Sequence, residues 1–308
     1  MLSTVPVPIL NSPKMLRSWP ARQRRSLRSL VPPAFAAAYA LGNHRRGAGV
    51  RQCAWQQRRA GSMPLFRRSA QAGNPQSEEA RWEMTVRLDA LRLMQEMVLP
   101  PLQPSLLLQR LGAAVSSCEA AQREAMEGHC APEQLEFLRG FVAHRFAGSP
   151  QAVGGLRICQ IGFNAGHSAA ALLDQAPEGS VLLSLDLGRH AYTRPLESFV
   201  AKAAEERGQT HVLLEGDSAE MLPRFRHIEF DLMFIDGNHA YEAVKLDLLL
   251  CLQMAQPESV VLLNHVFTDM DEGLGPTRAW LETLKDGDAV QAGWHSCCAR
   301  HGIAIAHP

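Results

Sequence analysis

The sequence predicts an α/β fold in which a parallel sheet carries helices on both faces. From Leu156 onward, short apolar runs alternate with stretches at helical spacing, a pattern typical of βαβ units. The first of these runs breaks at Gly162, carries a second glycine at Gly166 and resumes as an alanine- and leucine-rich helix. The strand, glycine turn and helix start let the backbone approach a nucleotide-like ligand.

Three helices are predicted before the sheet, and together they form a helical extension over residues 78–150. Glu78–Leu99 has apolar residues roughly at helical spacing and ends at a proline cluster. A second helix is expected from Ser105 to about Glu127. A third is expected over Pro132–Phe146, because proline suits a first helical turn and Gly148 follows the end.

Five strands, two closing strands and the helices between them complete the prediction. The five strands are Leu156–Ile161, Val181–Asp186, His211–Glu215, Phe230–Asp236 and Ser259–Asn264. The helices between them are expected to begin near His167, Thr193, Ser218 and His239. A further helix with Pro276 in its first turn should precede the closing strands, Ala289–His295 and Gly302–Ala306.

The charge of the chain is divided unevenly, although its formal net charge is zero. Residues 1–77 hold 13 Lys and Arg and no Asp or Glu, so all 31 acidic residues lie in 78–308. A long segment rich in Arg, Ser, Ala and Pro without acidic groups is typical of a disordered transit peptide for a plastid or mitochondrion. The alternative is a basic tail or nucleic-acid-binding arm, with the protein then expected in the cytoplasm.

Two further patterns narrow the class of protein. No apolar run reaches the roughly 18 residues of a membrane span, so no membrane partner is expected. The seven cysteines show no CxxC pair and no metal-finger spacing, which favours scattered reduced thiols over a disulfide framework.

Polar side chains follow the carboxyl end of each predicted strand, where open parallel sheets bind their ligands. Asp186, Asp217 and Asp236 each stand at such an end. A single Asp after a strand is usually a helix cap. Three in succession favour a nucleoside site.

These motifs, in this order, resemble those of class I S-adenosylmethionine-dependent methyltransferases, in the O-methyltransferase-like branch. The matching stretches are Gln160–Ser168 (QIGFNAGHS), Ser184–Asp186 (SLD), Glu215–Ser218 (EGDS) and Phe230–His239 (FDLMFIDGNH). The resemblance covers about residues 132–306. It implies a Rossmann-like, doubly wound sheet of seven strands with the last strand antiparallel, and a methyltransferase domain over residues 151–308.

The resemblance also implies S-adenosyl-L-methionine as cofactor, with Gly162 to Gly166 around its amino-acid part, Asp186 at the ribose, and Asp217 and Ser218 beside adenine. The full set expected to contact the cofactor is Gln160, Gly162, Phe163, Asn164, Gly166, Ser168, Asp186, Leu187, Asp217, Ser218 and Asp236. A dinucleotide-binding unit is the alternative, but three residues separate the two glycines where pyrophosphate binding requires the Gly-x-Gly-x-x-Gly order.

Two positions depart from the family pattern. Gln160 stands where an acidic residue is usual, and an amide makes a weaker contact with an ammonium group. Asn264-His265 replaces the Asp-Asn pair of metal-dependent members, so Asp236, Asn264 and His265 would form a poor magnesium site. We therefore expect no metal, although imidazole suits a softer divalent ion.

Methyl transfer to oxygen requires an aligned acceptor and a base that removes its proton. His239, three residues beyond Asp236, is the candidate base, and His265 is the second candidate. The predicted function is methylation of an oxygen on a small-molecule acceptor, and the leading helices suit a homodimer. The alternative is a degenerate methyltransferase fold that serves as a binding module. Nucleic acid is not an expected partner, because residues 78–308 are net acidic.

Overall fold

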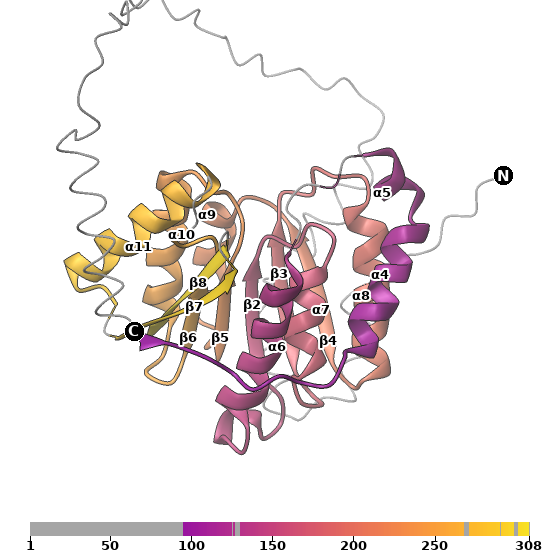
Figure 1. Cartoon of the computed structure of the whole chain (residues 1–308), viewed down its shortest axis with the longest axis horizontal. Helices are drawn as coiled ribbons and strands as arrows, with labels where there is room; N and C mark the ends of the chain where they lie inside the picture. The colour runs from indigo at the N-terminus through magenta and orange to yellow at the C-terminus, as the bar shows by residue number, and fades with distance from the viewer. Residues whose placement is uncertain are drawn as a thin grey trace, which may run out of the picture. The chain divides into compact units, whose positions relative to one another are not determined.

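The computed structural model describes residues 95–124, 126, 130–267, 271–289, 291–298 and 301–307. The described residues form an eight-stranded sheet with helices on both faces (Figure 1). Its strand order is β1-β7-β8-β6-β5-β2-β3-β4. The basic N-terminal segment and residues 78–94 of the first predicted helix lie outside the described residues.

Seven strands make up the main sheet, and the expected arrangement is confirmed. They are β2 (Arg157–Ile161), β3 (Val181–Asp186), β4 (Thr210–Glu215), β5 (Leu232–Ile235), β6 (Val260–Leu263), β7 (Gln291–Cys298) and β8 (His301–His307). Strands β2 to β6 are mutually parallel, while the last strand, β8, pairs antiparallel with both β6 and β7.

An eighth, two-residue strand corrects the first predicted helix. Gln95–Glu96 forms β1, which pairs parallel with β7 at the edge of the sheet. Beyond it, the backbone N–H of Met97 donates to the carbonyl of Trp294 at 2.8 Å. The helix predicted over Glu78–Leu99 is therefore wrong from Gln95 onward, because hydrogen bonds to a free sheet edge replace those of a helix.

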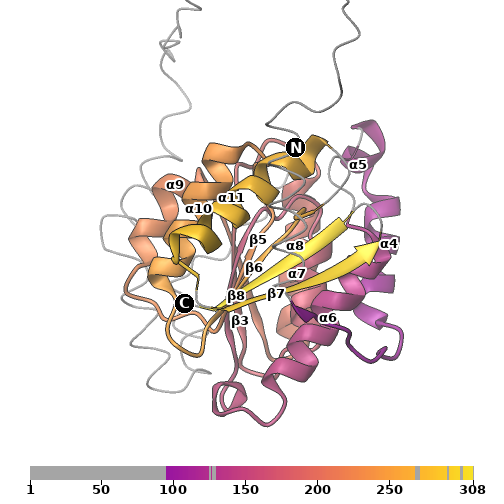
Figure 2. The same cartoon turned by 60° about the vertical axis from the view of Figure 1, so that its left-hand side comes forward.

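The helices cover the two faces unequally (Figure 2). On one face lie α4 (Leu106–Ser117), α5 (Glu119–Arg123), α6 (Pro132–Phe146), α7 (His167–Asp174) and α8 (Thr193–Glu206). On the other lie α9 (Ser218–Met221), α10 (Tyr241–Met254) and α11 (Leu274–Asp286). Short 3-10 turns occupy Pro150–Ala152, Leu222–Phe225 and Asp271–Gly273.

The third predicted helix is confirmed as α6, but the second is divided. Its residues form α4 and α5, separated by Cys118 in an extended conformation (φ −76°, ψ 109°). Neither Gly nor Pro marks this break in the sequence, so composition alone could not have placed it. None of the described helices combines the length and the apolar character needed to cross a bilayer.

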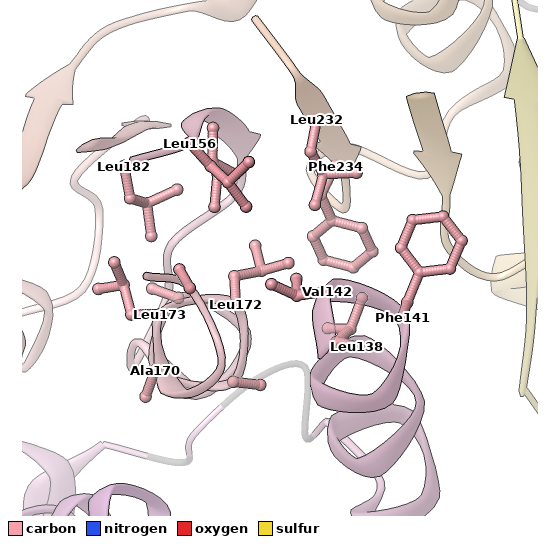
Figure 3. Packing of buried hydrophobic residues seen from close by; sticks show 14 of the residues in the cluster. Leu138, Phe141, Val142, Leu156, Ala170, Leu172, Leu173, Leu182, Leu232 and Phe234 are labelled. Atoms are coloured by element: carbon pink, nitrogen blue, oxygen red, sulfur yellow. The ribbon is translucent and has the colours of Figure 1, made fainter. Parts of the chain in front are cut away.

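The core lies between the sheet and the helices α6 and α7 (Figure 3). Leu138 and Phe141 of α6 face Leu172 of α7 and Phe234 of β5, and all four are at most 2 % exposed. Because α6 belongs to the predicted extension, the extension and the sheet share one core.

A buried ion pair fixes the helical extension further. Arg139 on α6 donates from Nε to Asp174 at the end of α7, at 2.7 Å, and Ser105 donates to the other carboxylate oxygen at 2.7 Å. Burial alone would raise the pKa of Asp174, but the hydrogen bonds from Ser105, Gln175 and Arg139 lower it below its usual value. The ion pair joins α6 to the end of α7, and Ser105, the N-cap of α4, binds the same carboxylate.

Candidate active site

A cavity of about 470 Å³ opens where β2 to β6 end at their carboxyl termini. Twelve of the predicted site residues line it: Gly162, Phe163, Asn164, Ser168, Asp186, Leu187, Asp217, Ser218, Asp236, His239, Asn264 and His265. Two do not, Gln160 and Gly166. Residues separated by more than a hundred positions in sequence thus meet at one edge of the sheet.

The loop after β2 is held against its neighbours by a carboxylate and a glycine. Oδ2 of Asp186 accepts from the backbone N–H groups of Phe163 and Asn164 at 2.8 and 2.9 Å, and Oδ1 accepts from Gly188 at 2.7 Å. Gly162 has φ +89°, and a Cβ there would lie 2.0 Å from the carbonyl oxygen of Asp236. Only glycine lets the loops after β2 and β5 approach this closely.

Gln160 acts beneath this loop and not within the cavity. It is fully buried, and its amide nitrogen donates to the carbonyl of Gly162 and to Oγ of Ser168 at 2.7 Å. Gln160 therefore contacts two residues that line the cavity without lining it itself, and its contact with a cofactor stays a prediction. Gly166, at φ +84°, is the residue before α7, and a Cβ there would meet the ring of Phe163 at 2.8 Å.

The residues expected beside adenine lie at the start of α9. Oδ1 of Asp217 accepts from the backbone N–H of Ala219 at 2.9 Å, so this Asp is a helix cap as well as a cavity residue. Ser218 donates to the buried carboxylate of Asp247, whose pKa burial raises to about 6. Leu187, 47 % exposed, adds an apolar wall to the same cavity.

The other part of the cavity carries a carboxylate between two imidazoles. Oδ1 of Asp236 lies 3.3 Å from Nε2 of His265 and 4.0 Å from Nε2 of His239. The two imidazole rings face each other with centroids 4.2 Å apart. His265 is almost buried, whereas the side chain of His239 is 30 % exposed.

The pKa values of this cluster follow from its contacts. Burial alone would raise the pKa of Asp236, but the neighbouring imidazoles and the amide of Asn264 lower it to about 2. Burial alone would lower the pKa of His265, but its contact with Asp236 and the charge of Glu272 raise it. Asp236 is therefore a carboxylate at neutral pH, and His265 holds its proton more firmly than usual.

Asn264 is held in the cavity wall by hydrogen bonds at both ends of its amide. The backbone N–H of Ala131 donates to Oε1 of Gln134, so the amide nitrogen of Gln134 faces Asn264 and donates to its Oδ1 at 2.8 Å. The amide nitrogen of Asn264 then faces Asp236 and donates to Oδ1 at 2.8 Å. The amide of Asn264 is therefore held on both sides, by Gln134 at its oxygen and by Asp236 at its nitrogen, and its place in a metal site with Asp236 and His265 stays a prediction.

The side-chain atoms of Asp236, His239 and His265 suit a transition-metal ion better than magnesium. Magnesium requires several hard oxygen ligands, and here one carboxylate stands among nitrogens. Among the described residues, the ligand atoms of Asp236, His239 and His265 lie within 4.8 Å of one another. Two imidazoles and one carboxylate suit a first-row transition ion, so His239 adds to the set predicted from the sequence.

The backbone near these side chains is unusual. His265 and Phe267 have φ values of +60° and +57°, in the left-handed region that costs non-glycine residues free energy. Gly275 approaches the backbone of His239 so closely that a Cβ at position 275 would lie 2.1 Å from the carbonyl oxygen of His239. Residues 268–270 of the loop between His265 and Gly275 lie outside the described residues.

Several cavity residues carry no signal in the sequence. Gln134 lies on a helix with no motif around it, and Arg189 and His190 follow β3 in a loop without a recognisable pattern. His167, at the first turn of α7, lines the cavity as its place in the Gln160–Ser168 motif leads one to expect. The buried His211 stacks on Phe163 with ring centroids 5.2 Å apart, and it stands on a strand where only its apolar neighbours follow a pattern.

Comparison with known proteins finds a methyltransferase domain in the part of the chain that holds these residues. Residues 159–266 match the family model described as a methyltransferase domain. No curated protein sequence matches the chain.

Solved structures of O-methyltransferases share the fold. The O-methyltransferase from Bacillus cereus in complex with SAH is 18 % identical, with a TM-score of 0.52 over 67 % of this chain and 93 % of that one. The O-methyltransferase TomG from Streptomyces achromogenes, in complex with SAM, is 18 % identical, with a TM-score of 0.51 over 75 % of this chain and 99 % of that one. Residues 159–266 therefore match a methyltransferase domain, and the chain shares the fold of these O-methyltransferases.

Proposed function

We propose that this protein transfers a methyl group from S-adenosylmethionine to an oxygen atom of a small-molecule acceptor. One observation carries the proposal. A single cavity joins the loop and carboxylates expected to hold the methyl donor to an ionised carboxylate between two imidazoles. A donor site and a proton-accepting site are the two parts that methyl transfer to a hydroxyl requires.

The donor half is built around Asp186. Its carboxylate accepts three backbone N–H groups, two at Oδ2 and one at Oδ1. A carboxylate offers about four lone-pair directions, so Oδ1 keeps one for a ribose hydroxyl. Phe163 and Leu187 supply apolar walls, and Asp217 and Ser218, which line the same cavity, are the residues proposed to flank adenine.

The acceptor half assigns the base to His239. His265 is more buried and is held by Asp236, which leaves the more exposed His239 to face an incoming acceptor. The acceptor oxygen attacks the methyl carbon, the carbon–sulfur bond breaks, and S-adenosylhomocysteine (SAH) leaves with the electron pair. The acceptor proton passes to the imidazole of His239.

We propose that this reaction does not depend on magnesium. The cluster of Asp236, His239 and His265 offers one carboxylate and two imidazoles, so Asp236 is its one hard ligand. A transition ion held by Asp236, His239 and His265 would lower the pKa of a bound hydroxyl. Loading with such an ion would occupy His239 and remove it as a base.

A non-catalytic binding module is the second candidate. The two departures from the family pattern, Gln160 and the Asn264-His265 pair, motivate it. The buried position of Gln160 weakens this motive, since its amide nitrogen donates to Gly162 and Ser168 and so supports the loop.

Calorimetric titration of the full chain with SAH, followed by an acceptor screen with methyl-labelled donor, tests the proposal. We expect saturable 1:1 binding and label transfer to at least one hydroxyl compound. Binding without any transfer would support the binding module. No heat and no thermal shift at millimolar SAH would reject the donor site itself.

We also propose that residues 1–77 direct the protein to a plastid or mitochondrion. The composition of that segment, with 13 basic and no acidic residues, supports this proposal. A reporter fused to residues 1–77 should enter one of the two organelles and lose the segment there. A reporter that stays in the cytoplasm would contradict it.

A further inference from the structure

Beneath the donor loop, a row of buried polar side chains crosses three neighbouring strands. Gln160 of β2 is paired in register with Ser184 of β3, and His211 stands two residues before the partner of Ser184 on β4. Side chains two residues apart on a strand share a face, so the three lie side by side. Gln160 and Ser184 are fully buried, and the side chain of His211 has no exposed surface.

The direction of each hydrogen bond in this row can be assigned from one carbonyl group. The carbonyl of Gly162 can only accept, so the contacting atom of Gln160 is its amide nitrogen. The amide oxygen of Gln160 then faces Ser184, whose hydroxyl must donate to it at 3.3 Å. A hydroxyl has one hydrogen, so Ser184 accepts from Nε2–H of His211 at 3.0 Å.

The row continues from Gln160 to the cavity. The same amide nitrogen donates to Oγ of Ser168 at 2.7 Å, and Ser168 lines the cavity. A hydroxyl that accepts from an amide keeps its own hydrogen for another acceptor. Ser168 is thus set to donate to a ligand, whereas a carboxylate at position 160 would have required that hydrogen for itself.

His211 begins this row from outside the cavity. It is not among the cavity-lining residues, and its ring stacks on Phe163 at an interplanar angle of 26°. Its Nδ1 has no hydrogen-bond partner among the described residues and lies 3.7 Å from the carboxylate of Glu197 on α8. Nε2 carries its hydrogen whether or not Nδ1 is protonated, so both states give the row the same direction.

We propose that His211 is a positioning residue for the methyl donor. Through Ser184 it acts together with the Gly162 carbonyl to hold the Gln160 amide, and the held amide leaves the Ser168 hydroxyl as a hydrogen-bond donor to the carboxylate of the donor's amino-acid part. The inference rests on the proposed function, because it assumes that S-adenosylmethionine occupies this cavity. His211 would thus affect ligand binding although it does not line the cavity.

Two probes separate this role from a general effect on stability. SAH contains the amino-acid part, and 5′-methylthioadenosine lacks it. Calorimetry of the full chain should show that His211→Leu lowers the affinity for SAH about tenfold. This loss is the size expected for roughly one net hydrogen bond. Binding of 5′-methylthioadenosine should stay within about twofold of wild type, because nothing in the nucleoside half depends on Ser168.

Matched variants make the test decisive. His211→Gln keeps an N–H donor and should retain SAH affinity within about threefold, while Ser184→Ala removes the relay from its middle and should repeat the tenfold loss. Ser184→Ala also serves if His211→Leu does not fold, and His227→Leu, an exposed histidine, is the control for substitution itself.

Each contrary result overturns a defined part. Unchanged SAH affinity in both His211→Leu and Ser184→Ala would reject the relay. Equal losses for SAH and 5′-methylthioadenosine, or an equal loss in His211→Gln, would reduce His211 to a packing role. Failure of the wild-type protein to bind either probe would reject the proposed function, whatever the variants do.

Discussion

At the residue scale, the contact between Asp236 and His265 couples stability to pH. The pKa of Asp236 falls from 3.8 to about 2, so its contribution is present above pH 3.8 and is lost as pH falls through the folded value. The pKa of His265 rises above 6.5, so its contribution is complete below pH 6.5 and is lost as pH rises through the folded value. The pair therefore stabilises the fold most between about pH 4 and 6.5.

Asp236→Asn should lower the free energy of unfolding by on the order of 2 kcal/mol within that window. The difference from wild type should shrink on both sides of it. Urea titrations from pH 3 to pH 9 measure the profile, and Asp288→Asn, an exposed carboxylate, is the control. A difference that does not change with pH would mean that the ionised pair is not what the substitution removes.

Also at the residue scale, the effect of substitution on turnover distinguishes His239 from His265 as the base. His239→Gln keeps polarity but removes the base, so we expect kcat to fall by roughly a hundredfold or more. The affinity for SAH should remain within about twofold, because His239 lies beyond the loop expected to hold the donor. Single-turnover assays with an acceptor from the screen measure the first effect and calorimetry the second. Full activity in this variant would transfer the role of base to His265.

At the scale of elements, Gly162 sets the distance between the loops after β2 and β5. An added Cβ would lie 2.0 Å from the carbonyl oxygen of Asp236, at a φ of +89°. Gly162→Ala should therefore reduce the free energy of unfolding by about 3 kcal/mol or more and abolish SAH binding. Gly148→Ala is the matched control, since it has φ +68° with nothing within 4 Å of the added Cβ. It should cost only about 1 kcal/mol, the price of the left-handed backbone alone.

The junction of α4, α6 and α7 depends on Arg139. Arg139→Met would leave Asp174 buried and ionised without its cationic partner, so we expect a loss of about 3–5 kcal/mol in unfolding free energy. The double variant Arg139→Met/Asp174→Leu should recover much of that loss, because no uncompensated charge remains. Guanidinium titrations of the two variants provide the measurement. A double variant no more stable than the single one would show that packing, not charge, dominates the junction.

At the scale of the whole molecule, hydrophobic patterning predicted most of the sheet. It could not predict the short edge strand or the orientation of polar side chains in the site. Apolar runs and glycine turns predicted the ends of β2 to β6 to within two residues. Strands buried on both faces of a parallel sheet appear in the sequence as uninterrupted apolar runs, which makes them easy to recognise. Strand β1 was missed because two residues have no periodicity, and its pairing with β7 depends on an edge formed far along the chain. The orientation of Gln160 and Asn264 was equally inaccessible, since Gly162 and Gln134 decide it through hydrogen bonds that no spacing rule encodes.

We expect residues 1–77 to be dispensable for SAH binding and the edge strand β1 to be needed for stability. Every residue that lines the cavity lies at or beyond Cys130, so removal of residues 1–77 should leave SAH affinity within about twofold of the full chain. Removal of residues 1–104 also deletes β1 and two contacts of Met97, its N–H to Trp294 and its carbonyl to Nδ1 of His295 at 2.7 Å. That variant exposes the edge of β7 and takes Ser105 to the new terminus, so we expect thermal unfolding several degrees lower and a tendency to self-associate. Differential scanning calorimetry and sizing of the two truncations decide the point, and equal stability of both would place β1 outside the cooperative fold.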